Sequence, residues 1–316
     1  MRSTPDNTSR FLIILTNIWN DAIDCNPITV WFSRVYRFDS HKDSGVIVHI
    51  PPKVVFSLKI VYNNNSFLAM EDNEVLMIKF IYVILMNLFR APYLIPKMRR
   101  EAEHPEKYSE EERYQLARHV IRLMKLSGGI RTKAFGIENL PKEGGYMMYP
   151  NHQGKYDALG IISTHVKPCS LVMDKAKSNT ILVREFIDLV QGKRLDKKDV
   201  RQALTIINEV SEAVKAGKRY ILFPEGGYEF NNRNRVYDFK AGSFKIALKT
   251  KAPIVPVALI DSYKVFNSFS FGPVTTQVHY LKPILYEEYG RFKTHEIAAM
   301  VKSRIEKKIH EILAHR

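Results

Sequence analysis

From Ser109 to the end of the chain, short apolar runs alternate with longer stretches of helical periodicity. The apolar runs at 131–137, 145–150, 169–174, 219–224, 253–260 and 275–284 predict strands, and the stretches at 110–127, 157–166, 178–190, 199–217, 241–250 and 294–315 predict helices. Strands that alternate with helices pair in parallel, because each helix carries the chain back along the sheet. The sequence therefore predicts an α/β fold with a largely parallel central sheet flanked by helices.

The chain before Ser109 has a different character. Residues 1–69 carry scattered Asn, Asp and Ser, including "YNNNS" at 62–66, and show no sustained periodicity or motif. We interpret them as an atypical extension, either a working region or an artefact of gene calling, with Met70 and Met77 as other candidate starts. We assign residues 70–129 to a helical membrane-associating segment and residues 130–316 to the α/β domain.

The segment 77–98 is apolar and aromatic, but charged residues and prolines interrupt it. A helix that spans a bilayer needs about 20 mostly apolar residues, and this segment is too broken for that. Two readings remain, a buried core helix and a helix in the membrane interface, and we favour the second. In that reading Lys79 and Arg90 lie near lipid head groups.

The charge of the chain indicates an anionic partner. The formal net charge is +15 over 316 residues, which suits nucleic acid, an anionic membrane or an acidic small substrate. Lys and Arg are scattered, and no helix-turn-helix, zinc finger or aromatic–basic RNA motif occurs, so nucleic acid is not expected. The two cysteines, Cys25 and Cys169, lie far apart and indicate a reduced protein on the cytoplasmic side.

The stretch "YPNHQGKYDALG", residues 149–160, places a histidine and an aspartate at a strand-to-helix corner. On a continuous helix His152 and Asp157 would point about 140° apart. With Gly154 to allow a tight bend, Asp157 in the first helical turn can face His152. A carboxylate on one imidazole nitrogen makes the other a better base. One alternative is a polar loop without catalytic function. Another is a metal site, but no cluster of further ligands accompanies the pair.

Two further loops add to this corner. "ILFPEGG", residues 221–227, is a buried strand that breaks into an acidic, glycine-rich turn, so Glu225 and His152 both follow strands and are expected at one sheet edge. "QGKRLDKKD", residues 191–199, is dense in cations just before a helix, which suits a phosphate. An ordinary turn and a solvated charged face are the alternatives for these two loops.

Together these residues resemble the four ordered blocks of the glycerolipid acyltransferase family, the 1-acyl-glycerol-3-phosphate acyltransferases. The blocks are Asn151-His152 with Asp157, then "KRLDKKD", then "FPEGG", then "IVPVAL", and the resemblance covers roughly residues 125–265. It implies that His152 is the general base and that Asp157 holds it. It also implies that Arg194 and Lys197 contact a phosphate, while Glu225 and Gly226 line the acceptor site.

The sequence departs from the family pattern twice. The second block reads Asp196-Lys197 where the family has Asp-Arg, and the third continues with Gly227-Tyr228 where the family has Thr and Arg. Lysine lacks the two-pronged contact of arginine with phosphate. Substitutes for the missing arginine come from further along the loop, at Arg233 and Arg235.

The expected function is therefore acyl transfer from acyl-CoA or acyl carrier protein to 1-acyl-glycerol-3-phosphate, on the cytoplasmic face of an anionic membrane. No metal or bound cofactor is expected, since the thioester is already activated. Alternatives are transfer to another lysophospholipid or an aminolipid, and a basic membrane-binding protein without enzymatic activity.

Overall fold

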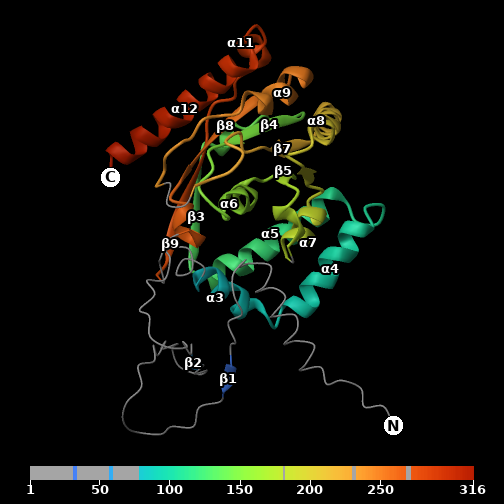
Figure 1. Cartoon of the computed structure of the whole chain (residues 1–316), viewed down its shortest axis with the longest axis vertical. Helices are drawn as coiled ribbons and strands as arrows, with labels where there is room; N and C mark the ends of the chain where they lie inside the picture. The colour runs from blue at the N-terminus through green and yellow to red at the C-terminus, as the bar shows by residue number, and fades with distance from the viewer. Residues whose placement is uncertain (1–30, 34–56, 60–77, 181, 230–232, 268–271) are drawn as a thin grey trace. The chain divides into compact units, whose positions relative to one another are not determined.

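The computed structural model describes residues 31–33, 57–59, 78–180, 182–229, 233–267 and 272–316 (Figure 1). The chain divides into two compact units, Met1–Ala69 and Met70–Arg316. In the first unit, β1 (Trp31–Ser33) and β2 (Ser57–Lys59) pair antiparallel, with Phe32 opposite Leu58. The second unit carries every motif found in the sequence.

A seven-stranded sheet forms the centre of the second unit. Its strands are β3 (Ile130–Phe135), β4 (Tyr146–Pro150), β5 (Ser170–Asp174), β6 (Lys193–Leu195), β7 (Arg219–Ile221), β8 (Ile254–Ile260) and β9 (Val274–Tyr280). They are ordered β3-β9-β8-β4-β7-β5-β6. Five of the neighbouring pairs are parallel, and the one between β8 and β9 is antiparallel. The predicted α/β fold with a largely parallel sheet is confirmed.

Helices cover both faces of the sheet. One face packs against a group made of α4 (Ala91–Glu103), α5 (Glu110–Ser127), α6 (Asp157–Thr164) and α7 (Val183–Leu189), while the other packs against α8 (Val200–Lys215), α9 (Lys245–Thr250) and α12 (Thr294–Ala314) (Figure 1). Short elements complete the fold: α10 (Tyr263–Phe266), α11 (Tyr286–Tyr289), η1 (Ile137–Asn139), η2 (Lys177–Asn179) and η3 (Ala241–Phe244).

Strand β4 shows why the central strands are apolar throughout. Tyr146 and Met148 belong to the cluster on the α4–α7 side, whereas Met147 and Tyr149 belong to the cluster on the α8–α12 side. Side chains of a strand alternate between the two faces, so a strand covered on both sides must be apolar at every position. All residues of β4 and β8 are accordingly buried.

The helix ends follow the local signals. Ser109 accepts a hydrogen bond from the backbone of Glu112, whose side chain caps Ser109 in return, as the capping-box spacing predicts. Helix α8 begins after Asp199, which caps two backbone N–H groups. Within the basic block 191–199, Lys193–Leu195 form β6 at the sheet edge, parallel to β5, a strand that the sequence analysis did not predict.

The segment 77–98 folds into two helices, α3 (Ile78–Asn87) and α4, separated by a turn; residue 77 lies outside the described residues. Val83 and Lys79 are buried, and Lys79 Nζ donates to the Gly272 carbonyl at 3.0 Å. The expectation that Lys79 lies near lipid head groups is therefore wrong. In the described part of the chain, no helix combines the length and the hydropathy that crossing a bilayer requires.

Candidate active site

The loop after β4 is fixed by its first residue. The Asn151 side chain is fully buried, donates to the Leu259 carbonyl at 3.2 Å and accepts from the Leu259 N–H at 2.7 Å. The amide side chain thus continues the pairing of β4 with β8 beyond the last backbone contact, Pro150 with Val257. This contact places the next residue, His152, at the carboxyl end of the sheet, where α/β folds place their sites.

His152 and Asp157 are in direct contact. The His152 Nδ1 and Asp157 Oδ2 atoms lie 2.7 Å apart. The same oxygen accepts from the backbone N–H groups of Gln153 and Gly154, and the Asp157 side chain is fully buried at the first position of α6. A helix N-terminus favours a carboxylate, and an N–H donor at Nδ1 leaves Nε2 as the basic nitrogen. The arrangement predicted from the sequence is present, and it suits a histidine base held by an aspartate.

Two aromatic rings hold the imidazole in place. The Phe223 ring stacks on His152 with centroids 4.1 Å apart, and the edge-on Tyr228 ring lies at 4.6 Å. Phe223 follows strand β7, and Tyr228 ends the "PEGGY" turn. Because both rings restrict rotation of the imidazole, the direction of its proton-accepting nitrogen is set before a substrate arrives.

Glu225 comes from the second loop and touches the first. Its Oε1 accepts from the His152 backbone N–H at 2.9 Å. Glu225 is only 8% exposed, and this burial raises its pKa to about 8, with a smaller contribution from the charge of Asp157. The other oxygen, Oε2, is buried without a hydrogen-bond partner among the described residues. A buried polar atom without a partner costs stability and is suited to a polar group of a ligand.

Gly226 is required for its backbone and its lack of a side chain. Its φ is +74°, and a Cβ there would lie 2.8 Å from Lys240 Nζ. The Lys240 ammonium therefore lies over the turn, in space that any other residue would occupy.

A network of buried polar side chains holds the His152 loop in place through Gln153. Gln153 Nε2 donates to Asn234 Oδ1 at 2.9 Å, and Gln153 Oε1 accepts from Ser262. Asn234 Nδ2 in turn donates to Asp261 Oδ1 at 3.0 Å, and Arg316 pairs with the other Asp261 oxygen. The sequence analysis missed this network, because its members are ordinary polar residues far apart in the chain.

The two cations predicted from the basic block bind carboxylates instead. Arg194 Nη2 lies 2.7 Å from Asp188 on α7, and Lys197 Nζ lies 2.7 Å from Asp174 at the end of β5. The Lys197 contact lowers the pKa of Asp174. Within the described residues, neither cation forms a hydrogen bond or ion pair with the His152 loop. Their role in phosphate binding stays a prediction.

Two other cations belong to this region, Lys155 from the His152 loop and Lys177 from η2. The Lys177 ammonium lies 5.3 Å from the centre of the Tyr228 ring, and the Lys155 ammonium lies 5.2 Å from the centre of the Phe80 ring. Desolvation of its ammonium and the nearby charge of Lys177 lower the pKa of Lys155. Two neighbouring cations repel one another, so an anion between them is favoured. Lys155 belongs to the stretch 149–160, but its proximity to Lys177 cannot be read from the sequence.

Arg233 and Arg235 flank Asn234 on the long loop after β7, and both are exposed. They line a cavity of about 350 Å³ between this loop and α12. Asn234, between them, also lines this cavity and contacts the His152 loop through Gln153.

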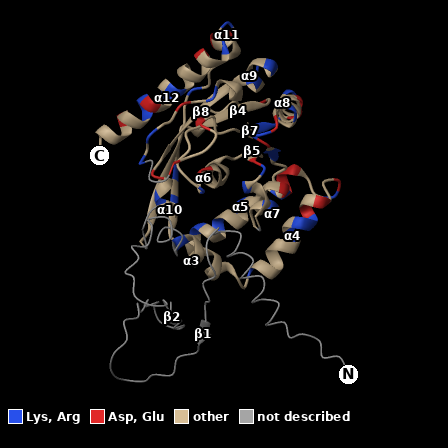
Figure 2. Ribbon diagram, in the orientation of Figure 1, with Lys and Arg blue, Asp and Glu red and all other residues tan. Residues whose placement is uncertain are grey.

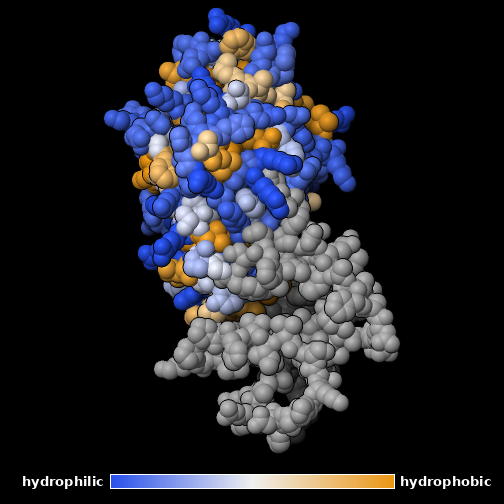
Figure 3. Space-filling view, turned by 90° about the vertical axis from the view of Figure 1, so that its left-hand side faces the viewer, coloured by the Kyte–Doolittle hydropathy of each residue, from blue (hydrophilic) through white to orange (hydrophobic). Residues whose placement is uncertain are grey.

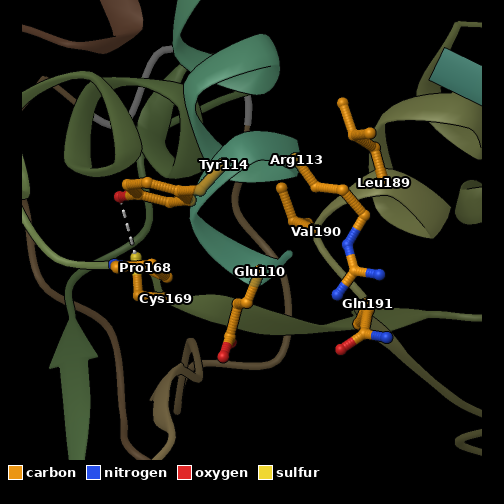
Figure 4. Close-up of a pocket in the computed structure, with 8 residues that line it drawn as sticks. All are labelled: Glu110, Arg113, Tyr114, Pro168, Cys169, Leu189, Val190 and Gln191. Carbon is orange, nitrogen blue, oxygen red and sulfur yellow. Dashed lines mark hydrogen bonds between the residues drawn. The ribbon is translucent and has the colours of Figure 1, made fainter. Parts of the chain in front are cut away.

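The one cysteine among the described residues, Cys169, lines a small cavity that does not include His152. Cys169 is buried, and its Sγ lies 3.3 Å from the Tyr114 hydroxyl (Figure 4). The cavity measures about 10 Å³, and Arg113 extends through it toward Gln191. Burial raises the pKa of Cys169 to about 12, so this thiol is a core group and a poor nucleophile. Among the residues described, no cluster of three or more His, Cys, Asp or Glu side chains could bind a metal ion.

Comparison with known proteins agrees with this geometry. The model of a family described as "Acyltransferase" matches residues 131–260, which carry His152, Asp157 and Glu225. Residues 131–260 belong to the acyltransferase family. The resemblance drawn from the four sequence blocks is thereby confirmed.

Individual relatives bear related names. A Saccharomyces cerevisiae protein named 1-acyl-sn-glycerol-3-phosphate acyltransferase is 30% identical over 204 residues, 62% of this chain and 65% of that protein. One of the same name from Borreliella burgdorferi is 25% identical over 201 residues, 62% of this chain and 79% of that protein. The chain thus spans just under two thirds of the yeast protein.

A solved structure has the same fold. The crystal structure of the 1-acyl-sn-glycerophosphate (LPA) acyltransferase PlsC from Thermotoga maritima matches with a TM-score of 0.58 and 21% identity, over 77% of this chain and 96% of that one. At this identity the likeness is one of fold. It supports the α/β architecture with the mostly parallel sheet.

Proposed function

We propose that this acyltransferase moves a fatty acyl group from acyl-CoA or acyl carrier protein to the hydroxyl of 1-acyl-glycerol-3-phosphate, giving phosphatidic acid. The observation that carries the proposal is the 2.7 Å contact between His152 and Asp157, in a loop that also binds Glu225. The names of the yeast and Borreliella relatives support the same acceptor.

The chemistry follows from the two ends of the imidazole. Asp157 holds Nδ1–H, so Nε2 removes the proton of the acceptor hydroxyl as its oxygen attacks the thioester carbonyl. The new C–O bond forms, the C–S bond breaks, and the departing sulfur takes the proton from the imidazolium, which yields a free thiol. No metal or resident cofactor enters these steps, because the acyl group is already activated as a thioester.

We assign the acceptor phosphate to the space beside Lys155 and Lys177. The Lys177 ammonium lies near the Tyr228 ring, which packs on His152, and the Lys155 ammonium lies near the Phe80 ring. The two charges repel one another, which favours an anion between them. Arg194 and Lys197 each contact a carboxylate 2.7 Å away, and within the described residues neither contacts the His152 loop. The buried Glu225 Oε2 offers a hydrogen bond to another polar group of the acceptor.

The turn between α3 and α4 supports attachment to the cytoplasmic face of an anionic membrane. Phe89 and Tyr93 are 72% and 67% exposed, and Leu85 and Met86 on α3 are partly exposed beside them. The Arg90 guanidinium lies 4.6 Å from the Phe89 ring centre. Much of α3 carries no charge (Figure 2). Exposed aromatic residues with adjacent cations suit the lipid interface, where each cation contributes about 1 kcal/mol.

A thiol-release assay with long-chain acyl-CoA and lysophosphatidic acid, combined with mass detection of phosphatidic acid, tests the transfer. We expect free thiol and phosphatidic acid in equal amounts. If thiol is released only with another lysophospholipid or an aminolipid, that lipid is the acceptor and the proposed one is wrong. No release with any acceptor would leave a basic membrane-binding protein.

Vesicle sedimentation tests the membrane surface. The Leu85→Asp, Phe89→Asp double variant should lose binding to anionic vesicles but retain activity on a short-chain, water-soluble lysophosphatidic acid. Val200→Asp with Leu204→Asp is a matched control, since these residues have the same spacing and are exposed on α8. Equal binding by both double variants would refute this surface, and unfolding of the first would assign the helix to the core.

A further inference from the structure

A cavity lies between the loop after β7 and the second half of α12. It measures about 350 Å³, within the size range of small-molecule sites. Arg233, Arg235 and Tyr237 line it from the loop, and Ile309 and Leu313 line it from α12. Glu306 also lies at this cavity, 3.8 Å from Lys302 of its own helix.

The lining combines cationic and apolar groups. Guanidinium groups bind phosphate through paired N–H donors, and they stack on flat ring systems. On the helix side, the buried Ile309 and the partly exposed Leu313 supply apolar surface beside Glu306 and His310. A ligand that carries phosphates beside a flat, partly apolar ring fits both walls.

The loop connects this cavity with the catalytic residues. Between the two arginines, Asn234 Oδ1 accepts a hydrogen bond from Gln153, the residue after His152. Three residues after Asn234, the Tyr237 backbone lies close enough to Glu225 to lower the pKa of that carboxyl. A ligand anchored at the cavity therefore lies against the same loop that supports the site.

The cavity lies against α12, whereas the residues proposed to contact the membrane lie on α3 and at the start of α4. Helix α12 packs on the sheet face opposite to α4 and α5 (Figure 1). The face shown in Figure 3 is mostly hydrophilic, with hydrophobic residues in separate spots. A lipid acceptor arrives from the membrane, whereas the polar end of a thioester donor arrives from water. The acceptor and the donor would then reach His152 by separate routes, one from the membrane and one from water.

We propose that this cavity holds the phosphorylated nucleotide end of acyl-CoA, with Arg235 and Arg233 on its phosphates and the apolar surface of α12 beside its base. The assignment rests on the proposed acyl transfer and selects a nucleotide-bearing donor. The flexible pantetheine arm then runs along the loop and brings the thioester to His152.

Donor kinetics separate this role from the chemistry. In Arg235→Glu, the KM for acyl-CoA should rise about tenfold or more, as the loss of a charged hydrogen bond implies. The KM for the matching acyl-pantetheine, which lacks the nucleotide, and the KM for the acceptor should not change. Arg201→Glu is the control, since Arg201 is exposed on α8 and undergoes the same charge change.

A binding measurement gives a readout without turnover. Adenosine 3′,5′-bisphosphate should bind the wild-type chain in calorimetry, and binding should weaken about tenfold in Arg235→Glu and in the cavity-filling Leu313→Trp. Equal losses with acyl-CoA and acyl-pantetheine would overturn the proposal, as would a loss confined to acyl carrier protein donors. Absence of turnover with every donor, while the nucleotide still binds, would refute the proposed transfer and leave the cavity assignment standing.

Discussion

Glu225→Gln should make the stability of this acyltransferase less dependent on pH. Burial raises the pKa of Glu225 from 4.5 to about 8, so the folded chain binds this proton more tightly than the unfolded chain does. The contribution of the protonated group is complete below pH 4.5, falls between pH 4.5 and 8, and is constant above pH 8.

The size of the effect follows from the pKa difference. Each unit corresponds to about 1.4 kcal/mol, so the wild-type chain loses up to about 5 kcal/mol through this group between pH 4.5 and 8. Glutamine has no proton to lose. Its carbonyl still accepts from the His152 N–H, and its amide takes the place of the Oε2 atom that has no partner. From pH 5.5 to 8, stability should therefore rise by about 3 kcal/mol in the variant relative to wild type.

Urea unfolding followed by circular dichroism at pH 5.5, 7 and 8 measures this difference. All other titrating groups are common to both chains, so their contributions cancel. Glu212→Gln, on the exposed side of α8, makes the same chemical change without burial and should give a curve parallel to wild type. Parallel curves for Glu225→Gln and wild type would refute the account of Glu225 as a buried carboxyl that holds its proton.

The remaining predictions concern turnover. His152→Ala should lower kcat by at least ~100-fold with unchanged unfolding temperature, and near-normal turnover would refute its role as base. Lys177→Ala should raise the KM for lysophosphatidic acid about tenfold, and adding Tyr228→Arg should recover part of the loss. Lys197→Ala should change this KM little; the reverse order would return the phosphate to the basic block. A chain that begins at Met77 should fold and keep its activity on soluble substrates, which solubility and thiol release would check.

The sheet and the histidine–aspartate pair could be predicted because their signals are local. Periodicity over a few residues predicts a strand or a helix, and Gly154 allows the bend that brings Asp157 to His152. Whether a strand pairs parallel or antiparallel with its neighbour is not set by local sequence. The pairing of β9 antiparallel to β8 depends on how the chain returns through α10 and the following segment, and no side-chain pattern within β9 records it.

Strand β6 and Lys79 show a second limit. The three residues of β6 include two cations, so their own composition favours a charged loop, and only the free edge of β5 makes them a strand. Lys79 is buried because the Gly272 carbonyl, far along the chain, accepts its ammonium hydrogen bond. Composition predicts exposure for such residues, and a distant partner overrides it.

The departures from the family pattern in the third block have one physical consequence. Where the family carries an arginine, this chain has Tyr228, which supplies no charge but offers a ring face, and the Lys177 ammonium lies 5.3 Å from its centre. A cation over an aromatic face gains about 0.5–2 kcal/mol, which helps to hold it beside His152. In the proposed site, Lys177 of η2 is the cation beside this ring. Tyr228 also packs edge-on against the imidazole. The same ring therefore contacts both the histidine base and the Lys177 ammonium.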